Sequence, residues 1–325
     1  MAASKRLPIS DHCDGRRFYN PRFHINRTWL DVLQWRRQST PTPWPTQVEI
    51  PPQTPQPTPQ DGTIRVTWIN HSSILIQTRH GNLLIDPVFS DRVSPFSWVG
   101  PKRVHPPGLR LQDLPTIDAI LLSHDHYDHC DKTTLRHLAE TFPQAQLICP
   151  LGNGTIGHRC GFDPSRITEL DWWDAHEVTV GFHIRATPSR HWSNRIRGPR
   201  NGRLWSGFFI HAGGRTAYYT GDTAWDDEMF SDVRRRCGSP DLAIIPMGAY
   251  EPRWFMESQH CNPAEAVRIH CTVEASRSIG VHWGTFQLTD EGREDPLHAL
   301  RVAREAAGLA SQAFTTLAPG ESILV

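Results

Sequence analysis

The sequence lacks three features that would each have indicated a particular class of protein. No apolar run approaches the roughly 18 to 20 residues that a membrane-spanning helix needs, so an integral membrane protein is not expected. The 34 Lys and Arg residues are balanced by 34 Asp and Glu residues. Because nucleic-acid-binding proteins usually carry a basic surplus, we expect no nucleic-acid partner.

Closely spaced cysteine pairs are the third missing feature. Seven cysteines are scattered through the 325 residues without a CxxC pair. An odd, dispersed set is typical of reduced thiols in a cytosolic protein, whereas an even set in a short secreted chain would indicate disulfides. The stretch MAASKRLPIS at the N-terminus has no apolar core of the kind that a secretory signal needs. We therefore expect a cytoplasmic protein.

Two residue types are abundant instead. The chain has 18 histidines and 12 tryptophans within an ordinary globular composition of 38% hydrophobic and 21% charged residues. Its 325 residues are enough to bury a large core. Because neutral imidazole is the commonest metal ligand, the histidine surplus suggests a metal site.

The N-terminal part of the chain differs from the rest. Residues 39–60, STPTPWPTQVEIPPQTPQPTPQ, are dense in proline, which blocks helices and internal strands and predicts an extended linker or arm. Residues 27–37, RTWLDVLQWRR, have apolar side chains near helical spacing. This pattern indicates a short helix, which either packs on the main body or contacts a membrane surface or a second copy in a homodimer. We expect residues 1–60 to be an N-terminal extension and residues 61–325 to form one domain.

From residue 61 onward, short strands come first and helices later. Alternating apolar residues predict an antiparallel meander at residues 64–70, 73–77 and 82–86. Helices are expected at 133–140, 263–270 and 296–307, and further strands at 118–122, 146–149, 183–187, 216–220, 241–246 and 277–281. Strands followed by alternating strands and helices indicate a layered α/β (α+β) fold.

The stretch LLSHDHYDHC at residues 121–130 concentrates metal-capable groups at one point of the chain. Apolar residues 117–122 predict a buried strand, and the loop after it holds three histidines and two aspartates in six positions. Such a loop can aim several side chains at one point. Imidazole and carboxylate suit zinc, iron, nickel or manganese, and the lack of thiolates argues against a structural zinc site of the cysteine type.

Further candidate ligands follow three other predicted strands. His191, Asp222 and His282 each come shortly or directly after such a strand. One residue of this kind is a weak signal, because a single histidine after a strand usually belongs to the surface or the core. The HxHxDH loop followed by three more strand ends of the same kind is far more specific. We therefore predict that the four strand ends meet around metal.

This ordered pattern resembles that of the metallo-β-lactamase superfamily, in which HxHxDH is followed by a later histidine, a bridging aspartate and a final histidine. The resemblance implies an αββα sandwich that holds two zinc ions and a bridging hydroxide. It also implies how this chain would divide its ligands: one ion bound by His124, His126 and His191, the other by Asp128, His129 and His282, and both by Asp222.

A second block of sequence narrows the family. Residues 247–256, MGAYEPRWFM, and 259–270, QHCNPAEAVRIH, resemble the N-acyl-phosphatidylethanolamine-hydrolysing phospholipase D family, as do DPVFS, GPKR, ELDWW, RHW and HWGTF elsewhere. The resemblance implies a phosphodiesterase in which the bridging hydroxide attacks phosphorus and releases phosphatidic acid and an N-acylethanolamine. It implies catalytic roles for Asp128, Asp222 and His260.

The chain departs from that family in places that bear on the substrate. Residues 1–60 do not match it, and Asp125 stands where an uncharged polar residue is expected. The loop around and after His191, residues 190–203, is unusually basic, with arginines at Arg190, Arg195, Arg197, Arg200 and Arg203. These arginines either form a solvated surface loop or attract a phosphodiester or an anionic membrane surface.

Four residues are candidates for substrate contact. His260 is a proton donor or phosphate ligand, or else it supports the metal ligands through hydrogen bonds. Arg253 binds phosphate or forms an ion pair with Glu251 or another acid. Tyr127 faces the substrate or packs beneath the ligand loop, and Gln259 belongs to the same motif as His260.

Other activities remain open at this point. His71 and Asp86 are expected to support the metal ligands by hydrogen bonds, whichever reaction the site performs. The main alternative is hydrolysis of another ester by the same fold, such as a lactone, a soluble phosphodiester or a β-lactam, because fold does not fix substrate. A redox di-iron protein would want a glutamate in place of His126, and a nuclease would need a basic arm, so both are disfavoured.

Overall fold

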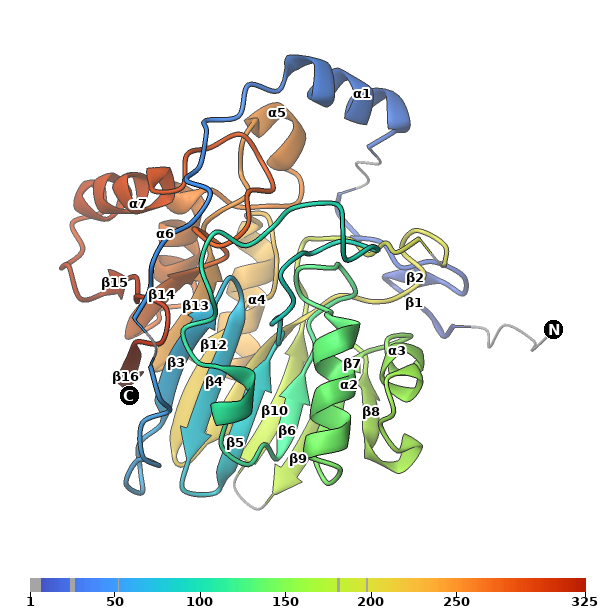
Figure 1. Ribbon diagram of the computed structural model, residues 1–325, viewed down its shortest axis with the longest axis vertical. Coiled ribbons are helices and arrows are strands. Elements are labelled where there is room, and N and C mark those ends of the chain that lie inside the picture. Colours follow the sequence, from blue (N-terminus) through green and yellow to red (C-terminus); the bar gives the residue numbers. More distant parts are fainter. Residues whose placement is uncertain (1–6, 24–26, 52, 180–181, 197) are drawn as a thin grey trace.

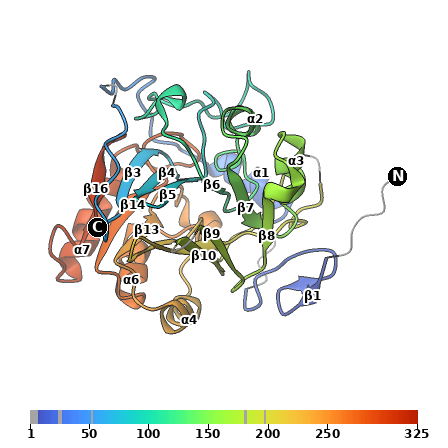
Figure 2. The ribbon, with the colours of Figure 1, turned by 90° about the horizontal axis from the view of Figure 1, so that it is seen from below.

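The computed structural model describes residues 7–23, 27–51, 53–179, 182–196 and 198–325. Two seven-stranded sheets face each other at its centre, and helices cover their outer faces (Figures 1 and 2). The predicted αββα sandwich is therefore confirmed. The chain forms this arrangement because each sheet is apolar on its inner face and needs a second layer to bury it.

The first sheet has the strand order β16-β3-β4-β5-β6-β7-β8. These strands are β3 (Arg65–Asn70), β4 (Ser73–Thr78), β5 (Gly81–Ile85), β6 (Ala119–Leu121), β7 (Gln146–Pro150), β8 (Ile167–Leu170) and β16 (Ser322–Leu324). The antiparallel meander expected from the sequence is present as β3, β4 and β5, and it continues into the parallel strands β6, β7 and β8.

The second sheet has the strand order β15-β14-β13-β12-β11-β10-β9. These strands are β9 (Ala175–Thr179), β10 (Phe182–Thr187), β11 (Gly207–Ala212), β12 (Arg215–Tyr219), β13 (Leu242–Pro246), β14 (Arg277–Val281) and β15 (Phe314–Thr315). Strands β12 to β15 run parallel, so each connection between them must cross over, and helices provide these crossovers.

The helices cover both sheets and the end of the sandwich. They are α1 (Trp29–Gln38), α2 (Lys132–Thr141), α3 (Gly154–Arg159), α4 (Asp227–Cys237), α5 (Arg253–Met256), α6 (Pro263–Thr272) and α7 (Asp295–Ala306). The sequence predicted α1, α2, α6 and α7, but α4 was missed because charged residues dominate it. Within the described ranges, no helix is both long and apolar enough to cross a membrane.

Two apolar layers hold the sandwich together. The layer between the sheets is built around large buried side chains such as Trp68, Phe208 and Tyr219. The other layer lies between the first sheet and the helices α2 and α3. Strand β4 contributes to both, with Ile74 in one and Leu75 in the other, and is buried at every position. Because both faces of β4 are covered, its apolar residues 74–76 follow one another without polar residues between them.

The N-terminal part wraps the outside of the sandwich. A short hairpin of β1 (Ile9–Ser10) and β2 (Cys13–Asp14) comes first, followed by α1. The helix begins at a capping box formed by Thr28 and Asp31. Its Trp35 ring stacks on Phe255 of α5 at a centroid distance of 5.1 Å, while Trp29 is 70% exposed. The helix therefore docks by one face and leaves another apolar face uncovered.

Gly108 marks a tight crossing of three chain segments. A Cβ atom at Gly108 would lie 2.0 Å from the backbone nitrogen of Gly320. Backbone hydrogen bonds tie these glycines to β3, because Gly108 N–H donates to Ile69 and Gly320 N–H donates to Trp68. A side chain at this point must therefore displace backbone that is already bonded.

We predict that Gly108→Ala lowers the free energy of unfolding by about 2–3 kcal/mol, because the added methyl group overpacks the crossing. Gly214→Ala is the matched control, since a Cβ atom there has open space and only the positive φ of +79° disfavours alanine. We expect that control to cost only about 1 kcal/mol. Urea unfolding of both variants measures the difference, and equal losses would contradict the argument.

Candidate metal centre

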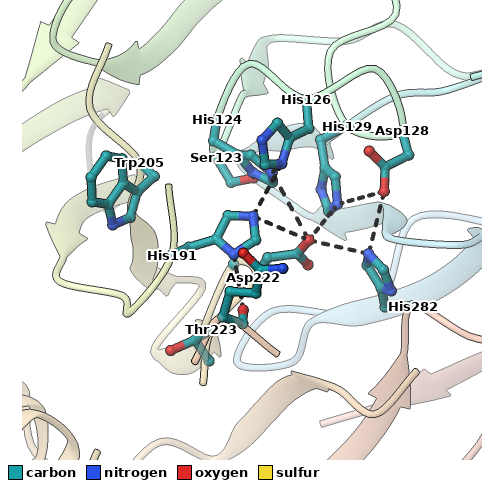
Figure 3. A network of polar contacts seen from close by, with 12 residues as sticks. Ser123, His124, His126, Asp128, His129, His191, Trp205, Asp222, Thr223 and His282 are labelled. Carbon is teal, nitrogen blue, oxygen red and sulfur yellow. Dashed lines mark hydrogen bonds and ion pairs between the residues drawn. The ribbon is translucent and has the colours of Figure 1, made fainter. Parts of the chain in front are cut away.

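The predicted strand ends meet at one edge of the sandwich. Strand β6 leads into the ligand loop, and strands β10, β12 and β14 lead to His191, Asp222 and His282. The last three of these residues are buried, because His191, Asp222 and His282 are each 2% exposed. Figure 3 shows the side chains of the ligand loop on one side of Asp222, with His191 and His282 flanking it. The structure thus brings the residues at these four strand ends to one point.

Three imidazole nitrogens form the first set. His126 Nδ1 lies 2.9 Å from His124 Nε2 and 3.1 Å from His191 Nε2. Asp222 Oδ2 lies 3.9 Å from His124 Nε2 and 3.8 Å from His191 Nε2. Atoms that bind one zinc ion tetrahedrally at about 2.0–2.2 Å lie about 3.3–3.5 Å apart, so the spacing fits one ion.

A second set lies on the other side of Asp222. Its carboxylate oxygen Oδ2 is 3.0 Å from His129 Nε2 and 3.1 Å from His282 Nε2. Asp128 Oδ2 completes the set at 3.5 Å from His129 Nε2 and 3.4 Å from His282 Nε2. Asp222 is thus within 4 Å of histidines in both sets, which is the position that a bridging ligand needs.

Hydrogen bonds through Nδ1 orient three imidazoles so that Nε2 faces the cluster. His124 Nδ1 donates to Ser123 Oγ at 2.9 Å, and His191 Nδ1 donates to the backbone oxygen of Gln259 at 2.9 Å. His129 Nδ1 donates to Asp86 Oδ2 at 2.8 Å. Burial lowers the pKa of His124 and His191, so the Nε2 atoms of both rings present lone pairs to the cluster. Burial lowers but Asp222 and Asp128 raise the pKa of His129 well above its usual value, so a cation must displace the proton on its Nε2.

Asp86 organises the base of the site. One of its oxygens accepts hydrogen bonds from His129, from Ser123 Oγ at 2.5 Å and from Tyr219 Oη at 2.6 Å, while the other accepts from Ser123 N–H at 2.7 Å. His71 supports the opposite end, where its Nε2 donates to Asp128 Oδ2 at 3.0 Å. Both residues have the supporting role that the sequence predicted.

The donor atoms fit a divalent cation. Among the described residues, His129 Nε2, His282 Nε2 and Asp222 Oδ1 are buried without a hydrogen-bond partner. Leaving buried polar atoms unpaired is costly, and a bound cation would give such atoms a partner. The chain therefore carries His and Asp clusters that can bind metal, of the nitrogen and oxygen type that suits zinc, iron or manganese.

The burial and charges of the cluster shift the pKa values of its histidines in opposite directions. Burial lowers the pKa of His126 to about 4 and that of His191 to about 3, so both rings are neutral lone-pair donors. Burial alone would raise the pKa of Asp222, but His129 and His282 lower it well below its usual range. Burial lowers the pKa of His282, but the carboxylates of Asp222 and Asp128 raise it more, to about 9. The site thus combines ionised carboxylates with imidazoles.

His260 follows α5 in the chain and lies beside this centre. Its buried ring lies 5.0 Å from the His191 ring and 5.3 Å from the His282 ring, measured between centroids. Its Nδ1 atom has no hydrogen-bond partner among the described residues. Gln259 contributes through its backbone, which accepts from His191, while its side chain lies against Met256.

Arg253 and Tyr127 have structural contacts. Arg253 pairs with Glu265, with its Nη2 2.9 Å from Oε2, and its Nη1 donates to the backbone oxygen of His260 at 3.0 Å. The ion pair considered for Arg253 is therefore present, although its partner is Glu265 and not Glu251. The Tyr127 ring lies under the Arg195 guanidinium at 4.0 Å, on the outer side of the ligand loop.

The arginine-rich loop is tied down and is not simply solvated. Arg195 donates to the backbone oxygens of Asp125 and Cys130, each at 2.8 Å, and Arg203 pairs with Asp125 Oδ2 at 3.0 Å. Arg190 and Arg200 lie over aromatic rings and donate to backbone oxygens, whereas Arg197 lies outside the described residues. The unusual Asp125 thus provides the anchor for a basic loop.

Sequence reasoning missed Glu291. Its carboxylate accepts hydrogen bonds from the backbone N–H groups of Ala249, Tyr250 and Glu251, at 2.5, 3.3 and 3.1 Å. These contacts shape the loop between β13 and α5, which leads to His260. Glu291 follows no strand and belongs to no recognised motif, so no local signal could have identified it.

Comparisons with known proteins agree with this geometry. Residues 81–283 match the family model described as the beta-lactamase superfamily domain. The chain is 39% identical over 263 residues to N-acyl-phosphatidylethanolamine-hydrolyzing phospholipase D 1 of Caenorhabditis elegans, covering 78% of this chain and 74% of that protein. It is 32% identical to the mitochondrial enzyme of that name from Saccharomyces cerevisiae, covering 76% of this chain and 53% of that protein.

The fold also resembles that of a solved metallo-β-lactamase fold protein. The metallo-beta-lactamase fold protein YhfI of Bacillus subtilis superposes with a TM-score of 0.56 at 18% identity, over 82% of this chain and 100% of that one. At that identity the likeness concerns the fold alone, while the sequence relatives extend it to the family. The chain therefore belongs to the metallo-β-lactamase superfamily, as a metallo-hydrolase similar in sequence to the N-acyl-phosphatidylethanolamine-hydrolysing phospholipases D.

Proposed function

We propose that the protein is a dinuclear zinc phosphodiesterase of the phospholipase D type. Its substrate is N-acyl-phosphatidylethanolamine, and its products are phosphatidic acid and an N-acylethanolamine. The observation that carries the proposal is the position of Asp222 between two sets of ligand atoms, each of a size that suits one ion. The names of the relatives supply the substrate class.

Two zinc ions in these sets would supply Lewis-acid chemistry, neutralising charge on phosphoryl oxygens and lowering the pKa of the attacking water. Asp128 and Asp222 contribute the fixed negative charge that retains both ions. Because each carboxylate is also positioned by histidines, the geometry is set before the substrate arrives. This preorganisation is the catalytic role that we assign to Asp128 and Asp222.

His260 is proposed to contact the phosphoryl group. Burial lowers the pKa of its ring well below the usual value, so the ring is neutral and can donate one hydrogen bond from an N–H group. Arg253 holds this histidine in place through the His260 backbone oxygen and is itself neutralised by Glu265. Gln259 positions His191 in the same way, so neither residue is proposed to bind the substrate through its side chain.

Membrane contact through α1 would bring a lipid substrate to the site. Trp29, Leu30 and Leu33 are 70%, 58% and 42% exposed, and Arg36 and Arg37 form the basic last turn of the helix. Figure 1 shows α1 beside α5, above the end of the sandwich that carries the ligand loop. A basic helix with an uncovered apolar face is typical of interfacial binding.

We predict that Asp222→Asn lowers the hydrolysis of N-acyl-phosphatidylethanolamine by about 10²–10³-fold or more and reduces the zinc content per chain. Asp232→Asn, at an exposed ion pair with Arg235 on α4, is the matched control and should retain both. Products are identified by mass spectrometry, and zinc is measured by elemental analysis. If wild-type protein hydrolyses a lactone but not this phospholipid, the proposed substrate is wrong.

Asp86→Asn should weaken zinc binding by about 10–100-fold, because His129 loses the carboxylate that fixes its tautomer. Competition with a chromogenic chelator measures this affinity. Asp118→Asn is the control, since Asp118 accepts a backbone hydrogen bond from Asn82 at 2.8 Å in the same sheet. Equal zinc affinities in the two variants would show that Asp86 has no part in metal binding.

The double variant Trp29→Ser, Leu33→Ser should bind vesicles of phosphatidylcholine and phosphatidylserine at least about tenfold more weakly, since each buried side chain contributes about 1.5–3 kcal/mol. Vesicle flotation measures the bound fraction. Val302→Ser, at a 49% exposed apolar residue on α7, is the control for a general loss of apolar surface. Unchanged flotation of the double variant would exclude docking through α1.

A further inference from the structure

A cavity lies on the outer side of the ligand loop. Its volume is about 830 Å³, and none of the seven clustered ligand residues is among the described residues that line it. The walls come from the segment after β5, from the ligand loop and the start of α2, from α3, and from the arginine-rich loop. The ligand loop therefore separates this cavity from the metal centre.

Basic side chains dominate the lining. The six are Arg92, Lys132, Arg136, Arg159, Arg195 and Arg203, against the two acids Asp91 and Asp131. The Asp131 carboxylate is already engaged, because it accepts from the backbone N–H groups of Ser90 at 2.9 Å and Thr133 at 3.0 Å. It caps α2 and is not available to neutralise the cavity.

Three of the basic side chains have no partner of their own. Neither a hydrogen bond nor an ion pair joins the side chains of Lys132, Arg136 and Arg159 to other described residues, in contrast to Arg195 and Arg203, which bind the ligand loop. Lys132 and Arg136 are four residues apart on α2 and so share one face. Like charges at this spacing repel each other. An anion bound between them and Arg159 would attract all three side chains and so offset that repulsion.

The lining also offers neutral groups of two kinds. The hydroxyl groups of Ser90, Ser97 and Thr133 are further hydrogen-bond donors. Apolar side chains complete the wall, with Phe96 50% exposed and Ile196 66% exposed. A ligand that fits this combination has a compact anionic group with several acceptor oxygens and tolerates apolar surface beside it.

We propose that this cavity is a second binding site, which takes a phosphate group independently of the metal centre. Lys132, Arg136 and Arg159 bind the phosphate oxygens, and the serine and threonine hydroxyls add neutral donors. The phosphate is either a free anion or the headgroup of a phosphomonoester lipid, whose chains would lie along Phe96 and Ile196. Because the ligand loop stands between the two sites, both can be occupied together.

The test compares the zinc-loaded wild-type protein with two variants. One is the double variant Arg136→Gln, Arg159→Gln, and the other is the single variant Lys132→Gln. Calorimetric titration uses two probes, inorganic phosphate and dihexanoyl phosphatidic acid below its micellar concentration. We expect the double variant to bind the better probe at least about tenfold more weakly than wild type, and Lys132→Gln to show a smaller loss. Arg268→Gln, at an exposed arginine on α6, is the control and should bind as wild type does.

Phosphate at the metal centre must be distinguished from phosphate in the cavity. Binding at the metals inhibits hydrolysis of a soluble phosphodiester competitively, and that inhibition constant should be the same in all variants, as should the uninhibited rate. Tight binding of phosphate identifies a free-anion site, and binding of the lipid alone identifies a headgroup site. The proposal is overturned if neither probe binds outside the metal centre, or if the double variant binds both probes as well as wild type.

Discussion

The placement of ionised carboxylates among buried imidazoles is the constraint on which the rest of the structure depends. Asp222 contacts histidines of both ligand sets, although its side chain is only 2% exposed. A buried charge is tolerated only when it is paired, so each carboxylate needs its neighbours at fixed distances. Asp86, one contact further out, satisfies the same requirement with four hydrogen bonds. The strands must then end where these groups can meet.

Much of this could be read from the sequence because the signals are local. The HxHxDH loop follows an apolar strand, and His191, Asp222 and His282 each follow another, so strand-end position predicted that these groups meet. The family resemblance implied which seven of them are ligands. The same strand-end reasoning placed Asp86, which directly follows β5. The short apolar strands followed by alternating strands and helices predicted a layered α/β fold, and the family resemblance implied the sandwich.

What the sequence could not provide depends on contacts between distant segments. Glu291 shapes the loop before α5, yet it lies 40 to 42 residues along the chain from the amides that it binds. The arginines after His191 looked like a solvated or phosphate-binding cluster, because spacing does not reveal that Asp125 and backbone oxygens are their partners. Strand β16 was missed for a related reason: its three residues become a strand only by pairing with β3.

The ligand sets join the two sheets, and this has a consequence for folding. His124, His126, Asp128 and His129 follow a strand of the first sheet, whereas His191, Asp222 and His282 follow strands of the second. A divalent ion bound there acts as a cross-link between sheets, and its binding energy adds to the cohesion of the fold. Since the contributing residues span positions 124 to 282, the complete centre exists only after non-local pairing is finished. In a cell short of the metal, the protein would therefore be less stable and shorter-lived, in addition to having a lower activity.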